Sequence, residues 1–586
     1  MTSASLPVRE ARGQRSPAAG ETASPTRSST AAVAVLAGVK DWWTHRAEAA
    51  GLTGGWLDVH RAVAADPPDL DISSVTAAAL TGTAEEVGRA YVSALPDSER
   101  SKHGRHYTPE ALATELWSMT KRAMGWKRPQ PLTGCVLDPA CGAGALLLPV
   151  LREHLGAAAR VDAQLALKGL PNFIAGVDND PAAVWLANVL LAAEMLPVLA
   201  RTERARRNPL PALVRHGDGL AAVNQPVRAV VMNPPYGRVQ LNPHERARFA
   251  GSLYGHANLY GLFMAAALES LDSKGVLAAL VPTSFLAGRY FENLRSALSR
   301  ETAIREIEFL ADRNGSFSGV LQETCLATFA RTKARKVTVA NINDQISEVA
   351  KIVAPRKGRP WLLPRRADDA PVAAAAIAMP LTLASAGWRV STGPLVWNRR
   401  KKDLTAGRTN SSAPIIWAAD IDGGVIHRDP ARDSHRFLTL KGSDEQVMVL
   451  SQPAILIQRT TAPEQHRRLV AAYLSAEVLQ DWGGRVVVEN HVNVARPRTS
   501  KPALSAESLS HLFATDTIDR VLRCLSGSVA VSAYELESLP LPDAEELERW
   551  AQLNRERLTR AISDAYRAKP ENVWARPRTV LSMSDE

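Results

Sequence analysis

Val231-Met232-Asn233-Pro234-Pro235-Tyr236-Gly237 is the stretch from which the rest of the chain is interpreted. Its first two residues continue an apolar run, which indicates the end of a buried β-strand. Each proline fixes its own φ at about −65° and pushes the residue before it out of the helical region. Asn233 and Pro234 are therefore expected to be extended just beyond the strand, with the Asn233 side-chain oxygen and the Pro234 carbonyl available as acceptors. With the Tyr236 ring beside them, these groups suit a planar substrate that carries an exocyclic amino group.

The composition is that of a globular protein with more than one domain. At 586 residues the chain is too long for one ordinary hydrophobic core, so two or three domains are expected. Hydrophobic residues make up 46% and charged residues 22%, which is typical of a soluble protein. The formal net charge of +10 favours a polyanionic partner, such as a nucleic acid.

The cysteines and the N-terminus predict a cytoplasmic protein. Four scattered cysteines without a CxxC pair predict neither a zinc site nor a disulfide framework, and they fit a reducing compartment. Residues 1–30 are rich in Ser, Ala, Thr, Pro and Arg and lack an apolar centre, so they predict a disordered tail rather than a secretory signal. No uninterrupted apolar run approaches the ~20 residues of a membrane span, and no membrane association is expected.

Short apolar runs alternate with amphipathic helical stretches through the middle of the chain. This alternation predicts an α/β fold with a mostly parallel, Rossmann-like sheet. The predicted strands are Cys135–Leu137, Phe173–Val177, Ala229–Met232, Val276–Val281, Glu306–Phe309 and Cys325–Phe329. Ligands of such sheets bind at the carboxyl ends of the strands, which is where the polar residues of interest fall.

Changes in composition predict the domain boundaries. We expect a helical N-terminal region at 31–100, the α/β domain at 101–335, a mixed α+β domain at 336–545, and a C-terminal helix and tail at 546–586. The basic, proline-punctuated stretch 333–366 is interpreted as a linker or domain edge. Thr108 is expected to cap the helix that begins at Pro109.

Three acidic residues stand in order at three turns of the predicted sheet. Asp138 opens a glycine-bearing turn, Asp138-Pro139-Ala140-Cys141-Gly142-Ala143-Gly144, whose DxxxGxG spacing differs from that of dinucleotide binders. This turn suits a ligand with a cationic amino-acid portion better than a pyrophosphate. Asp178 stands where ribose hydroxyls are commonly bound, and Asp218 stands at a third turn. One such acid alone is explained as a helix cap or turn residue, but three followed by Asn-Pro-Pro-Tyr are not.

Together these motifs resemble the S-adenosylmethionine-dependent N6-adenine DNA methyltransferases, in the type II group with the cofactor motif before Asn-Pro-Pro-Tyr and target recognition last. The resemblance covers roughly residues 101–331. It implies S-adenosylmethionine as methyl donor, with Asp178 at the ribose, Asp218 near the cofactor's adenine, and Phe317 against an extruded target base that also meets Tyr236. The other implied cofactor residues are Tyr107, Thr108, Pro109, Asp138, Pro139, Ala140, Cys141, Gly142 and Gly144, and the implied catalytic residues are Asn233, Pro234, Pro235 and Tyr236.

A weaker resemblance to target recognition regions continues through the C-terminal half, at 390–394, 489–491 and 526–528. It implies double-stranded DNA as partner, which the chain is expected to modify either as protection from a separate restriction endonuclease that acts on the same site or within a related defence system. The cluster Arg399, Arg400, Lys401 and Lys402 is a candidate DNA-contacting loop, although a charge run is as often a solvated surface.

The residues also suggest a mechanism. The adenine amino group is a poor nucleophile because its lone pair is conjugated into the ring. If Asn233 and the Pro234 carbonyl both accept its N–H bonds, the nitrogen can pyramidalise and attack the methyl group directly, without a covalent enzyme intermediate.

Three alternatives stay open. Asn-Pro-Pro-Tyr also occurs in enzymes that methylate RNA bases or protein glutamine, although those usually have much less chain beyond the catalytic domain. A fused enzyme that both methylates and cuts DNA is disfavoured because the region before Gly104 is short and helix-like. A catalytically idle DNA-binding subunit is disfavoured because every expected catalytic residue is present.

Overall fold

The computed structural model describes residues 29–52, 67, 70–72, 75–98, 100, 107–159, 161–310, 323–343, 345–355, 358–461, 465–525, 530–567 and 579–582. The predicted tail at 1–30 therefore lies outside the described residues, apart from its last two positions. The C-terminal tail predicted beyond the last helix is described only at 579–582, where a strand is found.

A ten-stranded sheet organises the first half of the chain, in the order β25-β11-β10-β8-β9-β7-β4-β1-β2-β3. The six predicted strands correspond to β1 Val136–Asp138, β2 Ile174–Asp178, β4 Val227–Met232, β7 Leu271–Pro282, β8 Ala303–Leu310 and β9 Thr324–Ala330. β1 and β2 begin and end one residue later than predicted, and the other four contain the predicted ranges. With β3 Val214–His216, the strands β2, β1, β4 and β7 are parallel to one another, and β9 is antiparallel to both of its neighbours. The predicted Rossmann-like fold is confirmed.

Helices cover both faces of this sheet, and the sequence explains why. The side chains of Val230 and Val231 point to opposite faces and join different core clusters, so both faces of the strand are buried. A strand buried on both sides has a continuous apolar run rather than an alternating one. On one face lie α5 Glu110–Met124, α6 Leu147–Ala157, α7 Ala163–Gly169 and α8 Pro181–Ala200; on the other lie α10 Leu259–Ser270, α11 Ser284–Ala287 and α12 Glu292–Glu301. The short α9 Pro243–Arg248 and the ribbon of β5 Arg238–Val239 with β6 Ala257–Asn258 lie between β4 and α10 in the chain.

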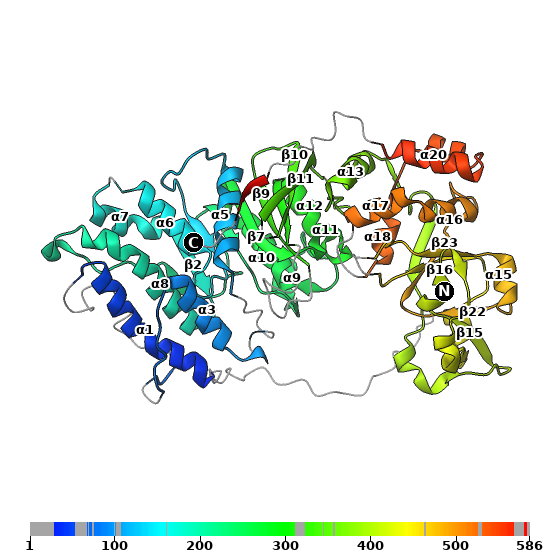
Figure 1. Cartoon of the computed structure of the whole chain (residues 1–586), viewed down its shortest axis with the longest axis horizontal. Helices are drawn as coiled ribbons and strands as arrows, with labels where there is room; N and C mark the ends of the chain where they lie inside the picture. The colour runs from blue at the N-terminus through cyan, green and yellow to red at the C-terminus, as the bar shows by residue number, and fades with distance from the viewer. Residues whose placement is uncertain are drawn as a thin grey trace, which may run out of the picture.

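The predicted helical N-terminal region packs on this layer. It contains α1 Thr30–Ala49 and α3 Ala84–Ala94, which both contact α8 and appear in blue in Figure 1. Thr83 and Glu86 form a reciprocal capping box that defines the start of α3. Among the described helices, α8 is long and apolar enough to cross a membrane by length and composition, but 78% of its apolar window is buried in the protein, as expected for a core helix.

The sheet continues past the predicted boundary at 335/336. β10 Lys336–Ile342 pairs parallel to β8, and β11 Gln345–Val353 pairs antiparallel to β10. Near the end of the chain, β25 Thr579–Ser582 pairs with β11. The interpretation of 333–366 as a linker is therefore wrong for its first twenty residues. The two strands contain one basic residue each, Lys336 and Lys351, and the basic and proline-containing character of the stretch comes mainly from the residues on either side of them.

The C-terminal half is a mixed α+β structure, as predicted, and lies at the right of Figure 1. One antiparallel sheet contains β13 Trp388–Thr392, β23 Val492–Pro497, β20 Ala454–Gln458 and β21 Ala471–Leu474, and a second sheet contains β14 Leu404–Thr405, β18 Phe437–Thr439, β15 Ser412–Ile416, β22 Val486–Val488 and β19 Val449–Leu450. Two small ribbons pair β12 Leu381–Thr382 with β24 Pro540–Leu541 and β16 Ile421–Asp422 with β17 Val425–Ile426. The helices are α13 Ala370–Ile377, α14 Asp444–Met448, α15 Ala476–Asp481, α16 Ala506–Ala514, α17 Asp516–Leu525, α18 Ala533–Glu537, α19 Ala544–Trp550 and α20 Arg555–Ala565.

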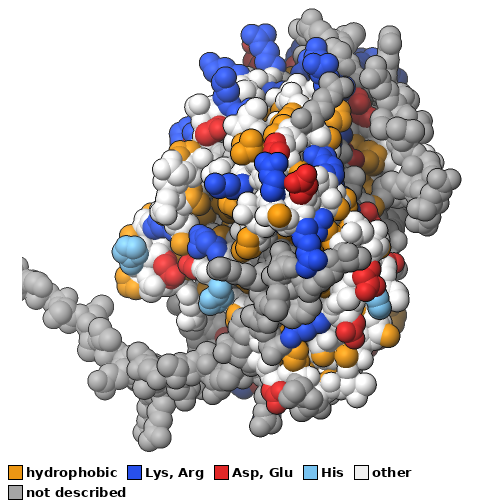
Figure 2. Space-filling view, turned by 90° about the vertical axis from the view of Figure 1, so that its left-hand side faces the viewer, with side chains coloured by type: hydrophobic (Ala, Val, Ile, Leu, Met, Phe, Trp, Pro, Cys, Tyr) orange, Lys and Arg blue, Asp and Glu red, His pale blue; other side chains and the backbone are white. Residues whose placement is uncertain are grey.

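The charge of the chain is not gathered at the end that lies at the left of Figure 1. Seen from that side, Lys and Arg side chains are interspersed with Asp and Glu and with apolar patches (Figure 2). A mixed surface of this kind gives no single-sign field, so this face offers no electrostatic argument for a polyanionic ligand.

Candidate active site

The strand order gathers the predicted residues along one edge of the sheet. β3, β2, β1 and β4 are neighbours in that order, and Asp178 and Asp138 end β2 and β1. Asp218 follows β3, and Asn233 follows β4. The chain leaves β1 toward β2 and β3 and returns to its other side at β4, which makes this edge a topological switch point. Four segments of the chain therefore contribute their polar residues to one line.

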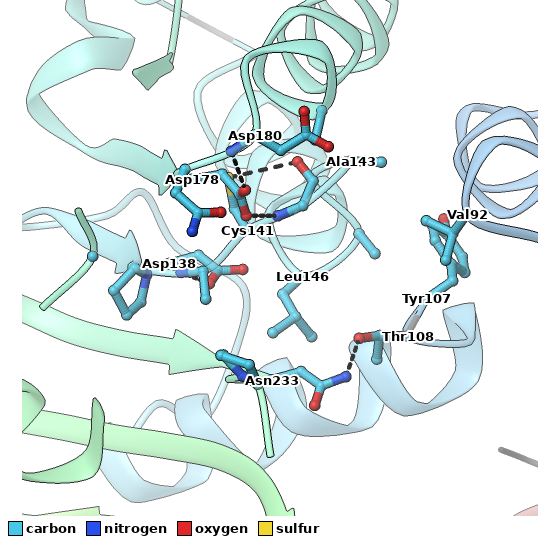
Figure 3. A pocket seen from close by; sticks show the side chains of 18 of the residues that line it. Val92, Tyr107, Thr108, Asp138, Cys141, Ala143, Leu146, Asp178, Asp180 and Asn233 are labelled. Atoms are coloured by element: carbon cyan, nitrogen blue, oxygen red, sulfur yellow. Dashed lines mark hydrogen bonds between the residues drawn. The ribbon is translucent and has the colours of Figure 1, made fainter. Parts of the chain in front are cut away.

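A cavity of about 260 Å³ opens at this line of residues (Figure 3). Its walls contain most of the predicted site residues: Tyr107, Thr108, Asp138, Pro139, Ala140, Cys141, Gly142, Asp178, Asp218, Asn233 and Pro235. Of the other predicted cofactor and catalytic residues that the structure describes, Pro109, Gly144, Pro234 and Tyr236 do not line the cavity. The catalytic segment therefore meets the cavity at its edge, through Asn233 and Pro235.

Asp138 is a buried carboxyl at the floor of the cavity. Its side chain is 1% exposed and accepts a hydrogen bond from the Ala140 N–H at 3.1 Å. Burial raises the pKa of Asp138 to about 8, against the lowering effect of the Ala140 N–H and with a further raising effect of Asp178. A cation bound beside this carboxyl would lower its pKa and favour the ionised form. The ammonium of an amino-acid ligand is such a cation.

The glycine turn after Asp138 brings backbone close to the ligand space. Gly142 has φ +51° and Gly144 has φ +85°, values that side chains rarely tolerate. The N–H of Gly142 donates to Asp178 Oδ2 at 2.8 Å, and the N–H of Asp180 donates to Asp178 Oδ1 at 2.9 Å. Asp178 therefore joins the turn after β1 to the turn after β2. Its carboxylate lines the cavity and presents acceptor oxygens only, which suits hydroxyl donors.

Asp218 and Gly219 close the next side of the cavity. Asp218 Oδ1 accepts from the Leu220 N–H at 2.8 Å, which defines the turn. A Cβ at Gly219 would lie 1.7 Å from the carbonyl oxygen of Pro139 and 3.0 Å from the ring of Phe263. Only glycine allows the Asp218 turn to approach the turn after β1 this closely.

Tyr107 supplies the observation that best tests the fit of a ligand. Its hydroxyl is buried beside the cavity without a hydrogen-bond partner among the described residues, and burial raises its pKa well above the usual range. A buried hydroxyl without a partner costs free energy, so a polar ligand atom here would satisfy it. The ring rests against α3 because position 88 is glycine, where a Cβ would lie 2.8 Å from Tyr107 Cε2. The acids, the open glycine turn and this hydroxyl fit S-adenosylmethionine.

The Asn233 amide is held from both sides. Its Nδ2 donates to Thr108 Oγ1 at 3.0 Å, and its Oδ1 accepts from the Tyr236 hydroxyl at 3.0 Å. The predicted helix cap at Thr108 is wrong: α5 begins at Glu110 after Pro109, and no side chain caps it. Because Pro109 is extended, Thr108 lies one residue too far from the helix and turns its hydroxyl toward Asn233 (Figure 3).

The predicted base-stacking residues have different outcomes. The Tyr236 ring packs edge-on against Tyr260, with ring centroids 6.1 Å apart, and its hydroxyl also lies 3.2 Å from the carbonyl oxygen of Leu280. In this arrangement the phenol orients Asn233, and its stacking role stays a prediction. Phe317 lies outside the described residues.

The predicted DNA-contacting cluster is divided in the structure. Arg400 is 20% exposed and pairs with Asp403 at 2.5 Å and with Asp444 at 2.7 Å. Lys401 is exposed and lies 5.3 Å from the centre of the Trp397 ring. Arg399 and Lys402 are exposed on the same turn. Arg400 therefore stabilises the loop, and the other three present their charges to solvent.

Sequence reasoning missed the part of the cavity that α3 builds. Tyr91, Val92 and Leu95 line it, and the Tyr91 hydroxyl lies 3.3 Å from Asp180 Oδ2. Phe263 from α10 closes the opposite side. The only sequence signal for α3 was its helical pattern, which does not indicate where the helix docks. Among the described residues, no group of three or more His, Cys, Asp or Glu side chains is arranged to hold a metal ion.

Comparisons with known proteins relate the chain to methyltransferases. Residues 172–317 match the model of the Eco57I restriction-modification methylase family. The type II methyltransferase M.PstI of Providencia stuartii is 28% identical over 333 residues, which cover 54% of this chain and 65% of that protein. M.BsuBI of Bacillus subtilis is 23% identical, with coverages of 55% and 66%. The chain thus spans slightly less than two thirds of the length of these curated relatives.

Among solved structures, the type IIL restriction-modification enzyme MmeI in complex with DNA aligns with a TM-score of 0.48 at 13% identity, over 85% of this chain and 79% of that one. This similarity is too low to add to the argument. In sequence, residues 172–317 match the Eco57I restriction-modification methylase family, and about half of the chain is similar to two type II methyltransferases.

Proposed function

We propose that this chain transfers the methyl group of S-adenosylmethionine to the N6 amino group of an adenine extruded from duplex DNA. The observation that carries the proposal is the Asn233 amide, held between Thr108 and Tyr236 at the edge of a cavity lined by Asp138, Asp178 and Asp218. The names of the curated relatives support a type II methyltransferase, and the family that residues 172–317 match supports a place in a restriction-modification system.

Asn233 has the main task in the proposed reaction. Bound S-adenosylmethionine would supply an activated methyl group. Asn233 Oδ1 accepts one bond from Tyr236 and keeps a lone pair for an N–H of the adenine amino group. The Pro234 carbonyl, which no helix uses, accepts the other N–H. Both acceptors stabilise the positive charge that develops on the nitrogen as the nitrogen–carbon bond forms and the donor's carbon–sulfur bond breaks. The methylated nitrogen then loses one proton to solvent, and the demethylated donor would leave the cavity.

The cofactor would be held by groups already in place. Asp138 would ionise beside the ammonium of the methionine portion, and Tyr107 would donate its hydroxyl to the same portion. Asp178 would accept from the ribose hydroxyls, and Asp218 from the adenine amino group. Because a base within a duplex cannot reach this edge, extrusion is required, with Tyr236 and Phe317 as its proposed stacking partners.

The wider assignments belong to the same proposal. We infer that the C-terminal half binds duplex DNA, with Arg399, Lys401 and Lys402 as candidate phosphate contacts. We also infer that the protein is cytoplasmic and that a separate restriction endonuclease acts on the site it protects. The same chemistry on RNA or on protein glutamine is the competing function, since the cavity itself does not distinguish their amino groups.

Methylation by the purified chain tests the proposal. The protein would be incubated with tritiated S-adenosylmethionine and, in separate reactions, with DNA from a host that lacks DNA methyltransferases, with RNA, and with protein. We expect label in DNA only, recovered as N6-methyladenine after digestion, and none with Asn233→Ala. Label that enters only RNA or protein would refute the assignment, and cleavage of the DNA with added Mg²⁺ would indicate a fused enzyme.

A further inference from the structure

We propose that the ion pair of Glu323 and Arg365 is a positioning device that links the C-terminal half to the catalytic amide. The inference rests on the proposed function of Asn233. Neither residue lines the cofactor cavity, and their role is to hold the end of β7, which orients Tyr236.

The ion pair is bidentate and poorly exposed. Arg365 Nε lies 3.0 Å from Glu323 Oε1, and Arg365 Nη2 lies 3.2 Å from Glu323 Oε2. The side chains are 19% and 15% exposed. The guanidinium also lies over the Phe309 ring, 4.2 Å from its centre. The planar guanidinium of Arg365 is fixed by two parallel hydrogen bonds and by its contact with the ring, so the ion pair is a rigid connection.

Glu323 connects the ion pair to the catalytic amide. The Thr283 N–H donates to the Glu323 carbonyl oxygen at 2.9 Å, and Thr283 Oγ1 donates to Glu323 Oε2 at 2.9 Å. Thr283 directly follows β7, and three residues earlier the carbonyl oxygen of Leu280 lies 3.2 Å from the Tyr236 hydroxyl. That hydroxyl in turn lies 3.0 Å from Asn233 Oδ1. A shift of the end of β7 therefore moves the acceptor that competes with Asn233 for the phenol proton.

Arg365 connects the ion pair to the C-terminal half. Its Nη1 lies 3.4 Å from the carbonyl oxygen of Arg523 in α17. Two residues before Arg365, the Leu363 N–H donates to the Cys524 carbonyl oxygen of the same helix at 2.9 Å. Asp369 pairs with Arg520 of the same helix at 2.7 Å. The segment that carries Arg365 is thus bound to α17 at three points, and a displacement of α17 would reach Glu323.

The experiment removes the ion pair without touching the cavity. Glu323→Gln and Arg365→Met, singly and together, would be compared with Glu306→Gln, a matched control. Glu306 is also 15% exposed and pairs with an arginine, Arg122, at 2.9 Å, but it does not contact Thr283. Methyl transfer to DNA from a methyltransferase-deficient host would give kcat, and calorimetry would give the Kd of S-adenosylmethionine.

We expect each single variant to lower kcat about tenfold, since small misplacements of catalytic groups have effects of this order. The Kd of S-adenosylmethionine should stay within twofold, and the double variant should be no slower than either single one. The control should keep kcat within twofold. An unchanged kcat, additive losses in the double variant, or an equal loss in the control would overturn the inference.

A second measurement does not depend on methyl transfer. The chain has nine tyrosines, so 3-fluorotyrosine labelling gives a tractable ¹⁹F spectrum, in which Tyr236→Phe assigns the Tyr236 signal. The chemical shift of that signal should change in Glu323→Gln. It should also change in Arg365→Lys and Thr283→Val, two milder substitutions that are included in case Glu323→Gln misfolds. It should not change in the control Glu306→Gln. A stationary signal would refute the device even if kcat falls. If the wild-type chain transfers no methyl group to DNA, the proposed function fails, while the ¹⁹F spectrum still decides the positioning role.

Discussion

Binding of S-adenosylmethionine should depend on pH through Asp138. The carboxyl is 1% exposed, and burial raises its pKa to about 8, so about one tenth of it is ionised at pH 7. A ligand ammonium favours the ionised form, which means that binding at lower pH must first remove a proton, at about 1.4 kcal/mol per pH unit. The ligand's own α-ammonium has a pKa of about 8, so affinity should peak near pH 8 and fall on either side.

These values set the size of the effect. Between pH 6 and pH 7 the Kd should fall roughly eightfold, and binding at pH 7 should release roughly 0.8 proton. Calorimetry at both pH values, in two buffers with different ionisation enthalpies, measures both quantities. The folded-state pKa of Asp138 lies above that of an unfolded aspartate, so this group destabilises the free protein as pH rises from about 4 to about 8. The ligand-induced rise in Tm should therefore be larger at pH 8 than at pH 6.

Two controls isolate Asp138. Asp138→Asn cannot titrate, so its weaker binding should vary less than twofold between pH 6 and pH 7. Methylthioadenosine, which lacks the amino-acid portion and its ammonium, should bind the wild-type chain with the same flat profile. A wild-type Kd for S-adenosylmethionine that is constant over this range, with no proton released, would refute the reasoning.

Three further variants test other contacts. Tyr107→Phe should weaken S-adenosylmethionine binding about tenfold without lowering the Tm of the free protein, because the lost hydroxyl has no described partner; a lowered Tm would contradict this. In Gly219→Ala the new Cβ would lie 1.7 Å from the Pro139 carbonyl oxygen, so the variant should lose about 1–3 kcal/mol of stability and most of its affinity for S-adenosylmethionine. The control Gly251→Ala, whose Cβ meets open space, should lose neither. Equal losses of Tm in the two variants would contradict this explanation. Arg400→Ala should lower the Tm because Asp403 and Asp444 lose their shared partner. Lys402→Ala should leave the Tm unchanged and reduce the slope of log K for DNA binding against log salt concentration by about one. The reverse pattern would mean that Lys402 stabilises the loop and Arg400 contacts DNA.

The sequence predicts the central strands and the polar residues after them because one physical cause governs both. Strands buried on two faces have unbroken apolar runs, and parallel strands end at one edge, so Asp138, Asp178 and Asn233 could be assigned to a common site from order alone. The contribution of Tyr91 could not be predicted. It depends on how α3 docks on α8, and that docking is set by tertiary packing between segments about a hundred residues apart.

The hydrogen-bond roles of side chains were also beyond the sequence. Thr108 before Pro109 has the sequence pattern of a helix cap. The same pattern also fits a structure in which the helix begins one residue later and the Thr108 hydroxyl points away from it. The extended Pro109 selects the one in which the hydroxyl meets Asn233 instead of the helix. Likewise, the cluster at Arg399–Lys402 has four equal charges in sequence, and only the placement of Asp403 and Asp444 distinguishes Arg400 from its neighbours.

The boundary predicted at 335/336 does not separate two independent domains, because contacts cross it in the sheet and at a buried arginine. A cut there would separate β10 from β8 and expose a strand edge that is fully paired in the intact sheet. It would also remove Gly358 and Arg359, whose carbonyl oxygens accept from the buried Arg295 at 2.9 and 3.2 Å. Arg295 is 0% exposed and reaches Tyr534 of α18 as well, so a cation of the catalytic layer is satisfied partly by the C-terminal half. Without these partners the buried guanidinium would keep only the contacts of its Nη1 to the carbonyl oxygens of Phe285 and Gly288, and the loss of the other acceptors is destabilising. The catalytic layer is therefore complete only with the chain beyond residue 336, and the two halves are expected to unfold as one cooperative unit.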